Sequence, residues 1–187
     1  MRPAVTVPAI RLATPADAAQ IARVRVESWR RTYRGMIPDS YLDAMTIEGS
    51  TAIWTRVLTA GANTTTVVVA EDEAGVQAFA AGLMLDPPKL DMDSELSAIY
   101  VAAEHQRQGL GRRLVATVAA AQMAHGATGM LTWVIAANKA ARTFYERLGA
   151  ELLVQQPFQW DGMDLVEAGY GWRDVSALAE AAALVRH

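Results

Sequence analysis

Residues 96–114 constrain the possible fold of this chain more strongly than any other segment, because they join an apolar strand, a loop and a glycine-marked helix. The strand is predicted to end near Val101, and Gly109-Leu110-Gly111 opens a helix whose apolar spacing continues to His125. The first amides of a helix lack acceptors within it, and the helix dipole makes that end partly positive. The segment therefore predicts an anion site, above all for a phosphate, at the start of this helix.

The residues around this helix start fit a phosphate well, although a glycine pair can also serve only to begin a helix. Glycines remove the Cβ atoms that would keep a pyrophosphate away from the backbone. Arg107, Arg112 and Arg113 add positive charge, and a guanidinium group suits phosphate geometry. A dinucleotide site of the Rossmann type is disfavoured, because its third glycine would fall at Leu114 and the loop before Gly109 is too long.

The composition is that of one globular domain and excludes several kinds of site. A chain of 187 residues, 52% of them hydrophobic, can bury about 70% of its unfolded surface around a single core. There is no cysteine, which excludes disulfides, cysteine-ligated zinc and a cysteine nucleophile. The three histidines show no metal-ligand spacing, so no metal site is expected. The net charge of -3 disfavours a nucleic-acid partner.

The chain also lacks the sequence signals of a membrane or secreted protein. No stretch approaches the roughly 20 apolar residues that span a bilayer. The first residues contain no continuous apolar segment of the kind found in signal peptides. The sequence therefore predicts a cytoplasmic protein with no membrane partner.

Hydrophobic periodicity predicts alternating strands and helices. The predicted strands cover residues 10–12, two runs within 64–85 on either side of a turn at 73–75, then 96–101, 130–136, 151–156 and 163–172. The predicted helices cover residues 14–34, 38–42, 47–58, 109–125 and 138–148, and an alanine-rich tail at 174–186. Because strand–helix–strand runs favour parallel pairing, this order indicates an α/β fold with a mixed sheet.

Three motifs, in this order along the chain, resemble those of the GNAT superfamily of N-acetyltransferases. The first is an early segment that contains Trp29, Tyr33-Arg34-Gly35-Met36-Ile37-Pro38 and Tyr41-Leu42. The second is the acetyl-CoA signature Gln/Arg-x-x-Gly-x-Gly/Ala, present as residues 106–111. The third is an Asn-x-x-Ala-x-x-Phe-Tyr-Glu-x-Leu-Gly pattern, carried by Asn138, Ala141, Phe144, Tyr145, Glu146, Leu148 and Gly149. One departure is Ala103, where many members have proline.

The resemblance covers residues 8–172 and implies the fold and the coenzyme. The implied fold is a GNAT-like mixed sheet of about six or seven strands, flanked by about four helices. Residues 1–187 are then one acyl-CoA-dependent domain, extended by a C-terminal helix at 174–187. The apolar side of that helix, with Val175, Leu178, Ala182 and Val185, could pack on its own domain or on a second subunit. Because family members often pair, a homodimer is expected.

The resemblance further implies that acetyl-CoA is the cosubstrate and that its thioester is attacked directly by an amine. The residues expected to bind the coenzyme are Ile99, Val101, Gln106, Arg107, Gln108, Gly109, Leu110, Gly111, Arg112 and Asn138. Val101 would present its backbone amide to the thioester carbonyl, and Ile99 would bind the pantetheine arm. Asn138 could equally be a plain helix cap.

The expected catalytic residues are Tyr145 and Glu95. Tyr145 would protonate the leaving thiolate, or would only pack beside Phe144. Glu95 would take the proton of the amine through water, or would be a solvated residue at a strand end. Asp91 and Asp93 could attract a cationic acceptor, or could simply form a polar loop.

The residues expected at the acceptor are Trp29 and Tyr33, which could instead belong to the core, where Trp133 is also expected. The favoured function is transfer of an acetyl group to a primary amine of a small molecule or peptide. One alternative is acetylation of protein N-termini or lysines. Another is a non-catalytic sensor that binds acyl-CoA.

Overall fold

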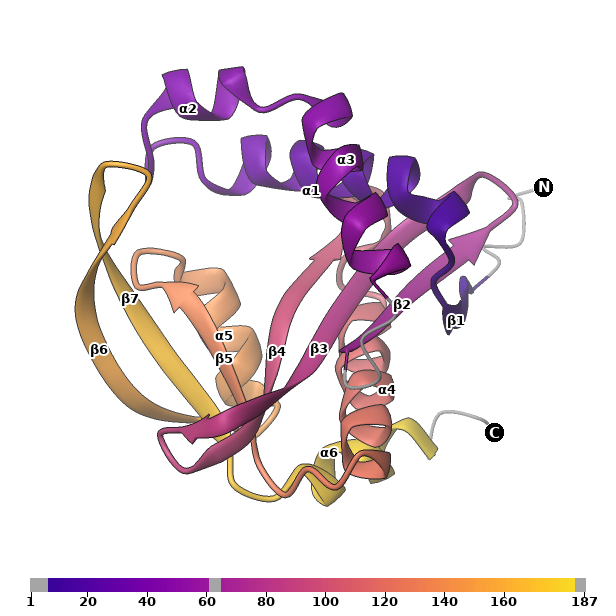
Figure 1. Ribbon diagram of the computed structural model, residues 1–187, viewed down its shortest axis with the longest axis vertical. Helices are drawn as coiled ribbons and strands as arrows, with labels where there is room; N and C mark the ends of the chain where they lie inside the picture. The colour runs from indigo at the N-terminus through magenta and orange to yellow at the C-terminus, as the bar shows by residue number, and fades with distance from the viewer. Residues whose placement is uncertain (1–6, 61–64, 184–187) are drawn as a thin grey trace.

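The computed structural model describes residues 7–60 and 65–183 of the chain. Its centre is a seven-stranded sheet in the order β1-β2-β3-β4-β5-β7-β6 (Figure 1). The strands are β1 (Ala9–Leu12), β2 (Thr65–Asp72), β3 (Gly75–Lys89), β4 (Met92–Val101), β5 (Met130–Ile135), β6 (Glu151–Trp160) and β7 (Met163–Trp172). All neighbouring strands are antiparallel except β4 and β5, which are parallel. The predicted α/β class with a mixed sheet is therefore confirmed.

Helices cover both faces of this sheet. They are α1 (Ala18–Thr32), α2 (Asp39–Ala44), α3 (Ile47–Thr59), α4 (Leu110–Ala124), α5 (Lys139–Arg147) and α6 (Val175–Ala183), with short 3-10 turns at Pro15–Asp17 and Ala103–His105. One face packs against α4 and α6, and the opposite face packs against α1 and α3. No helix in the described part of the chain is long and apolar enough to cross a membrane.

β3 and β4 are longer than the sequence predicts, because both extend to the turn that joins them. β3 continues to Lys89 and β4 already begins at Met92. Their ladder is irregular between Met84 and Lys89, where Pro87 and Pro88 have no N–H to donate. Prolines count against a strand in a sequence pattern, which is why the extension was not predicted.

This extension gives Asp93 a structural position inside β4. Its carboxylate accepts hydrogen bonds from the Thr128 N–H and hydroxyl and from the Gly129 N–H, at 2.7–3.0 Å. Burial would raise the pKa of Asp93, but these hydrogen bonds outweigh burial and lower it. Asp93 is therefore engaged in fixing the entry to β5 instead of forming a free loop that could attract an acceptor.

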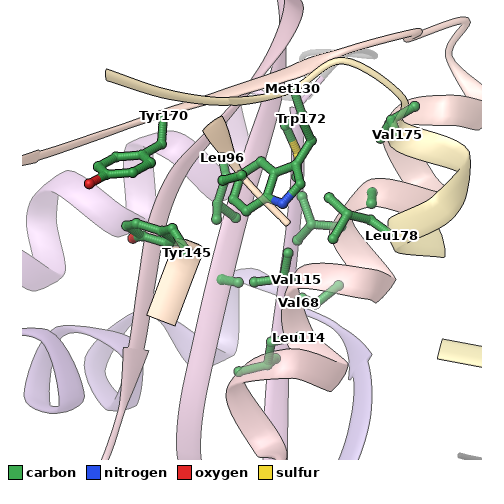
Figure 2. Packing of buried hydrophobic residues seen from close by; sticks show 14 of the residues in the cluster. Val68, Leu96, Leu114, Val115, Met130, Tyr145, Tyr170, Trp172, Val175 and Leu178 are labelled. Carbon is green, nitrogen blue, oxygen red and sulfur yellow. The ribbon is translucent and has the colours of Figure 1, made fainter. Parts of the chain in front are cut away.

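The C-terminal helix α6 packs on its own domain. Val175 and Leu178 are 1% and 6% exposed and lie in one cluster with Val115 and Trp172 (Figure 2). α4 is the main partner of α6. Of the alternatives for this apolar side, packing within the domain is the one observed. The side chain of Ala182 and the whole of Val185 lie outside the part of the chain that the structure describes.

Candidate active site

A gap between β4 and β5 opens into a cavity. The two strands pair only at Ser94 with Met130 and at Glu95 with Leu131. Just beyond this point β4 has a bulge at Ser97, because Gly82 of β3 pairs with Leu96 while Ala81 pairs with Ala98. The resulting cavity measures about 910 Å³ and is lined by β4, β5, the start of α4, α5 and the end of α1. This volume is large enough for an extended ligand.

The backbone of β4 directs polar groups of Ile99 and Val101 into this cavity. Ala102 donates its N–H to Gln77 at 2.8 Å, and the register pairs Tyr100 with Phe79. Since alternate residues of an antiparallel strand point their polar groups in opposite directions, Ile99 and Val101 point theirs away from β3. Both residues line the cavity. The strand therefore offers hydrogen-bonding groups where a neighbouring strand would normally lie.

The loop before α4 is tied back to β4 by a side chain. Gln106 donates from Nε2 to the Val101 carbonyl at 3.0 Å, and Gln108 donates to the Glu104 carbonyl at 2.8 Å. Arg107 has a left-handed backbone with φ of 61°. Gln106 and Arg107 line the cavity, whereas Gln108 does not. Gln108 therefore contributes to the shape of the loop.

The two glycines at the start of α4 have different physical roles. Gly109 has φ of 78°, which strongly favours glycine, and nothing lies within 4 Å of where its Cβ would be. A Cβ on Gly111 would lie 3.2 Å from the Phe144 ring, so glycine permits the close packing of α4 and α5. The Leu110 side chain is buried in the core and leaves only its backbone for a ligand. Arg112 is exposed and lines the cavity.

Tyr145 lines the cavity and is 6% exposed. Its ring lies near those of both Tyr170 and Trp172, with centroids 6.2 and 5.9 Å away (Figure 2). Burial raises the pKa of Tyr145 to about 12, and the Thr132 side chain offsets this only in part. Thr132 is itself held by donating to the Leu96 carbonyl at 2.9 Å. Tyr145 thus packs in the core and also presents a protonated phenol at the cavity.

Asn138 is the N-cap of α5 and also lines the cavity. Its side-chain oxygen accepts from the Ala141 N–H at 3.1 Å, as the capping alternative predicts. It is 5% exposed and lies near the Tyr33 hydroxyl, whose pKa it lowers against the stronger effect of burial. The amide of Asn138 is therefore fixed in place beside the cavity.

Glu95 lies outside the residues that line the cavity, although Leu96 and Ser97 follow it there. It is half-buried in β4 at the point where β4 and β5 still pair. Burial raises the pKa of Glu95; Lys89 lowers it, and Glu167 raises it further. The residue is thus close to the cavity along the strand, but separated from it by the bulge.

The two residues expected at the acceptor differ in position. Tyr33 lines the cavity with Ser28 and Thr32 of α1, whereas Trp29 does not. The Trp29 indole donates to the Tyr100 hydroxyl at 2.8 Å, and its ring lies 4.8 Å from that of Tyr33. Trp29 therefore supports the wall of the cavity from behind, and Tyr33 is part of the wall.

An aromatic bridge joins the α1–α2 region to the β6–β7 hairpin. Trp160, at the end of β6, lies 5.2 Å from Trp29 and 4.9 Å from Tyr41, measured between ring centroids. Ile37, Leu42, Met45, Met163 and Leu165 belong to the same cluster. Figure 1 shows the tip of this hairpin reaching α2. We call this cluster the aromatic bridge.

Several residues of the site were not found by sequence reasoning. Ser97, Tyr100 and Thr132 line the cavity, and Trp133, expected in the core, is half-buried and lines it too. The motif around Gly109 can be recognised from neighbouring residues in the sequence, whereas no sequence pattern predicts the bulge at Ser97. Trp133 has buried neighbours on both sides in β5, so its sequence context is that of a core residue. It lines the cavity only because of the gap beside this strand.

The chain is similar to known acetyltransferases over nearly its whole length. Residues 63–149 match the model of the acetyltransferase (GNAT) domain family. The chain is 38% identical over 170 residues to the uncharacterized N-acetyltransferase YuaI of Bacillus subtilis (strain 168), covering 90% of this chain and 95% of YuaI.

Two of the similar solved structures contain acetyl-CoA. One is YncA from Salmonella typhimurium, with a TM-score of 0.64 and 21% identity over 88% of this chain and 92% of that one. The other is a GNAT superfamily phosphinothricin acetyltransferase from Sinorhizobium meliloti, with a TM-score of 0.66 and 21% identity over 89% and 88%. At these identities the likeness concerns the fold.

Proposed function

Because the chain belongs to the GNAT acetyltransferase family, we propose that this acetyl-CoA-dependent enzyme acetylates the primary amine of a small molecule or of a peptide end by direct attack. One observation carries the proposal. A single cavity brings together the glycine-marked start of α4, the free edge of β4 and the Tyr145 phenol. These are the groups that a phosphate, a chain of amides and a leaving thiolate each require.

The residues at the cavity fit acetyl-CoA along its length. The amides at the start of α4, with Arg107 and Arg112 beside them, suit the pyrophosphate. The free backbone groups of Ile99 and the fixed amide of Asn138 suit the polar pantetheine arm. When bound, acetyl-CoA supplies an activated acetyl thioester. A metal is not required by this arrangement.

Two groups of the chain are suited to the charge that develops during transfer. The Val101 N–H, directed into the gap, can donate a hydrogen bond to the acetyl carbonyl oxygen as it becomes negative. Tyr145, with its pKa near 12, remains protonated and can donate to the sulfur. Complete transfer of its proton to a thiolate with a pKa of about 8.5 would be uphill, so donation of a hydrogen bond is the larger part of this role.

Glu95 is the group proposed to accept the amine proton. A lysine-like amine has a pKa near 10.4 and must become neutral before it can attack. Burial raises the pKa of Glu95 toward the range in which a carboxylate is a more effective base. Because Glu95 lies outside the cavity wall, the proton of the amine would have to reach its carboxylate through water.

The aromatic bridge favours a small or terminal amine over a lysine on a folded protein surface. It joins α2 and the β6–β7 hairpin through Trp160, on the side of the molecule where Tyr33 lines the cavity. A folded surface loop would need an open groove there. A slender amine needs only a passage. A protein N-terminus therefore remains the second candidate, and an internal lysine is disfavoured.

The first test is release of the coenzyme thiol from acetyl-CoA in the presence of aminoglycosides, polyamines, amino acids and short peptides. The peptides would include matched pairs with a free or a blocked N-terminus, and with or without an internal lysine. Release that depends on a small amine or a free N-terminus would support the proposal. Release that depends only on internal lysine would contradict it. Tight binding of acetyl-CoA without release for any amine would favour the sensor.

A further inference from the structure

A second cavity adjoins the first at two arginines. It measures about 390 Å³ and lies between α4, the end of α5, the end of β7 and α6. Arg112 of α4 and Arg147 in the last turn of α5 line both cavities. These two side chains therefore stand at the junction of the two cavities.

Both arginines at this junction are available to a ligand. They are exposed, and among the residues whose side chains the structure describes, neither makes an ion pair or a hydrogen bond. The two carboxylates that line the second cavity already have partners. Glu151 accepts from Arg173 at 3.1 Å, and Asp174 accepts from the Ser176 N–H and hydroxyl at 2.9 and 2.6 Å.

Coenzyme A carries more phosphate than the start of α4 accounts for. Its pyrophosphate is accounted for by the start of α4 and Arg107. Coenzyme A carries one more phosphate, a dianionic monoester on the ribose 3′ position, beyond the pyrophosphate. Arg147 belongs to another helix and, like Arg112, lines both cavities, so it adds a second positive charge there. A guanidinium pair of this kind is suited to such a phosphate.

We propose that Arg147, together with Arg112, binds the 3′-phosphate of coenzyme A at the junction of the two cavities. This assignment rests on the proposed function, because it takes coenzyme A as the ligand of the larger cavity. It makes Arg147 a residue that selects the coenzyme over its 3′-dephospho form.

The test is equilibrium binding of coenzyme A and 3′-dephospho-coenzyme A, measured by calorimetry at low salt, which requires no knowledge of the acceptor. Loss of charge-assisted hydrogen bonds from one arginine corresponds to about a tenfold change in Kd. The wild-type protein should bind coenzyme A about tenfold more tightly than the dephospho form. Arg147→Gln should abolish most of this preference and leave the Kd for the dephospho form unchanged.

Two further arginines provide matched controls. Arg31→Gln, at an exposed position on α1, should change neither Kd. Arg107→Gln should weaken both ligands by a similar factor, because both contain the pyrophosphate. An unchanged preference in Arg147→Gln, or equal weakening of both ligands, would overturn the assignment and leave the proposed function intact. Failure of the wild-type protein to bind either ligand would overturn both.

Discussion

At the scale of single residues, Tyr145 combines a structural and a proposed chemical role in separate parts of one side chain. Its ring packs near Tyr170 and Trp172, while its phenol stays protonated beside the cavity. The two alternatives considered from the sequence, an acid and a packing residue, are therefore compatible. Removing the hydroxyl alone separates them.

Tyr145→Phe should lower turnover by about 10²-fold and change the Kd for acetyl-CoA by less than about twofold. The ring contacts are retained, so the protein should keep its unfolding temperature. Turnover and Kd would be measured with the amine identified in the panel, and unfolding by calorimetry. Turnover equal to that of the wild type would show that Tyr145 has a packing role only.

The raised pKa of Glu95 has opposite effects on its proposed activity as a base and on the stability of the folded chain. Burial raises its pKa, so the folded chain binds this proton more tightly than the unfolded chain does. The associated stability is present at low pH and is lost as the pH rises through the raised pKa. At pH 7 the charged carboxylate therefore disfavours the folded state.

Glu95→Gln should lose activity and should be at least as stable as the wild type at pH 7. In the wild type, kcat/KM should fall as the pH decreases through the raised pKa, and this acidic limb should be absent from the variant. Asp93→Asn is the matched comparison, since the pKa of Asp93 is lowered and that variant should be less stable at pH 7. An unchanged pH profile in Glu95→Gln would assign the base elsewhere.

At the scale of elements, the site depends on one gap between parallel strands and on one contact between a helix and a hairpin. The gap exposes the backbone of β4, and the aromatic bridge is the feature that we propose limits access on the acceptor side. The bridge is formed by side chains from segments far apart in the chain. Trp160 contacts both Trp29 and Tyr41, so it is the residue whose removal should open it.

Trp160→Ala should raise kcat/KM for a bulky amine relative to a slender one by on the order of tenfold, because the passage widens. The KM for acetyl-CoA should not change, since Trp160 does not line the coenzyme cavity. Trp160→Phe, which keeps a ring in the bridge, should give an intermediate ratio. A constant ratio across the three proteins would show that the bridge does not limit the acceptor.

At the scale of the whole molecule, α6 packs against α4 and the core beside it. Its residues Val175 and Leu178 complete the core on the α4 side of the sheet (Figure 2). The expectation that 1–187 forms one domain stays a prediction, as does the homodimer. Since this apolar face of α6 is already covered within the domain, a dimer would need a different surface.

Leu178→Ala should lower the free energy of unfolding by about 2–3 kcal/mol, because it leaves a cavity in the core. Leu152→Ala, at a position that is 48% exposed, should change it by less than about 0.5 kcal/mol. Denaturant unfolding would measure both values. Equal small effects would mean that α6 is not part of the cooperative unit.

The sequence by itself determined the features that need only a few neighbouring residues. The helix start at Gly109, the cap formed by Asn138 and the apolar spacing of α4 are local requirements, and each was predicted. These local signals, in the right order, were sufficient for the family, the α/β class and the coenzyme motif. The two prolines before Lys89 show the limit of such signals, because the local rule against proline in strands missed the end of β3.

The tertiary structure alone decided which of these residues face the cavity and what surrounds them. The bulge at Ser97, the burial of Glu95 and the contact between Trp29 and Trp160 depend on side chains brought together from distant parts of the chain. A short segment of sequence cannot predict such contacts, because their energy comes from packing and desolvation against other elements. The same dependence explains why Tyr33 lines the cavity while Trp29, one helical turn away, supports it from behind.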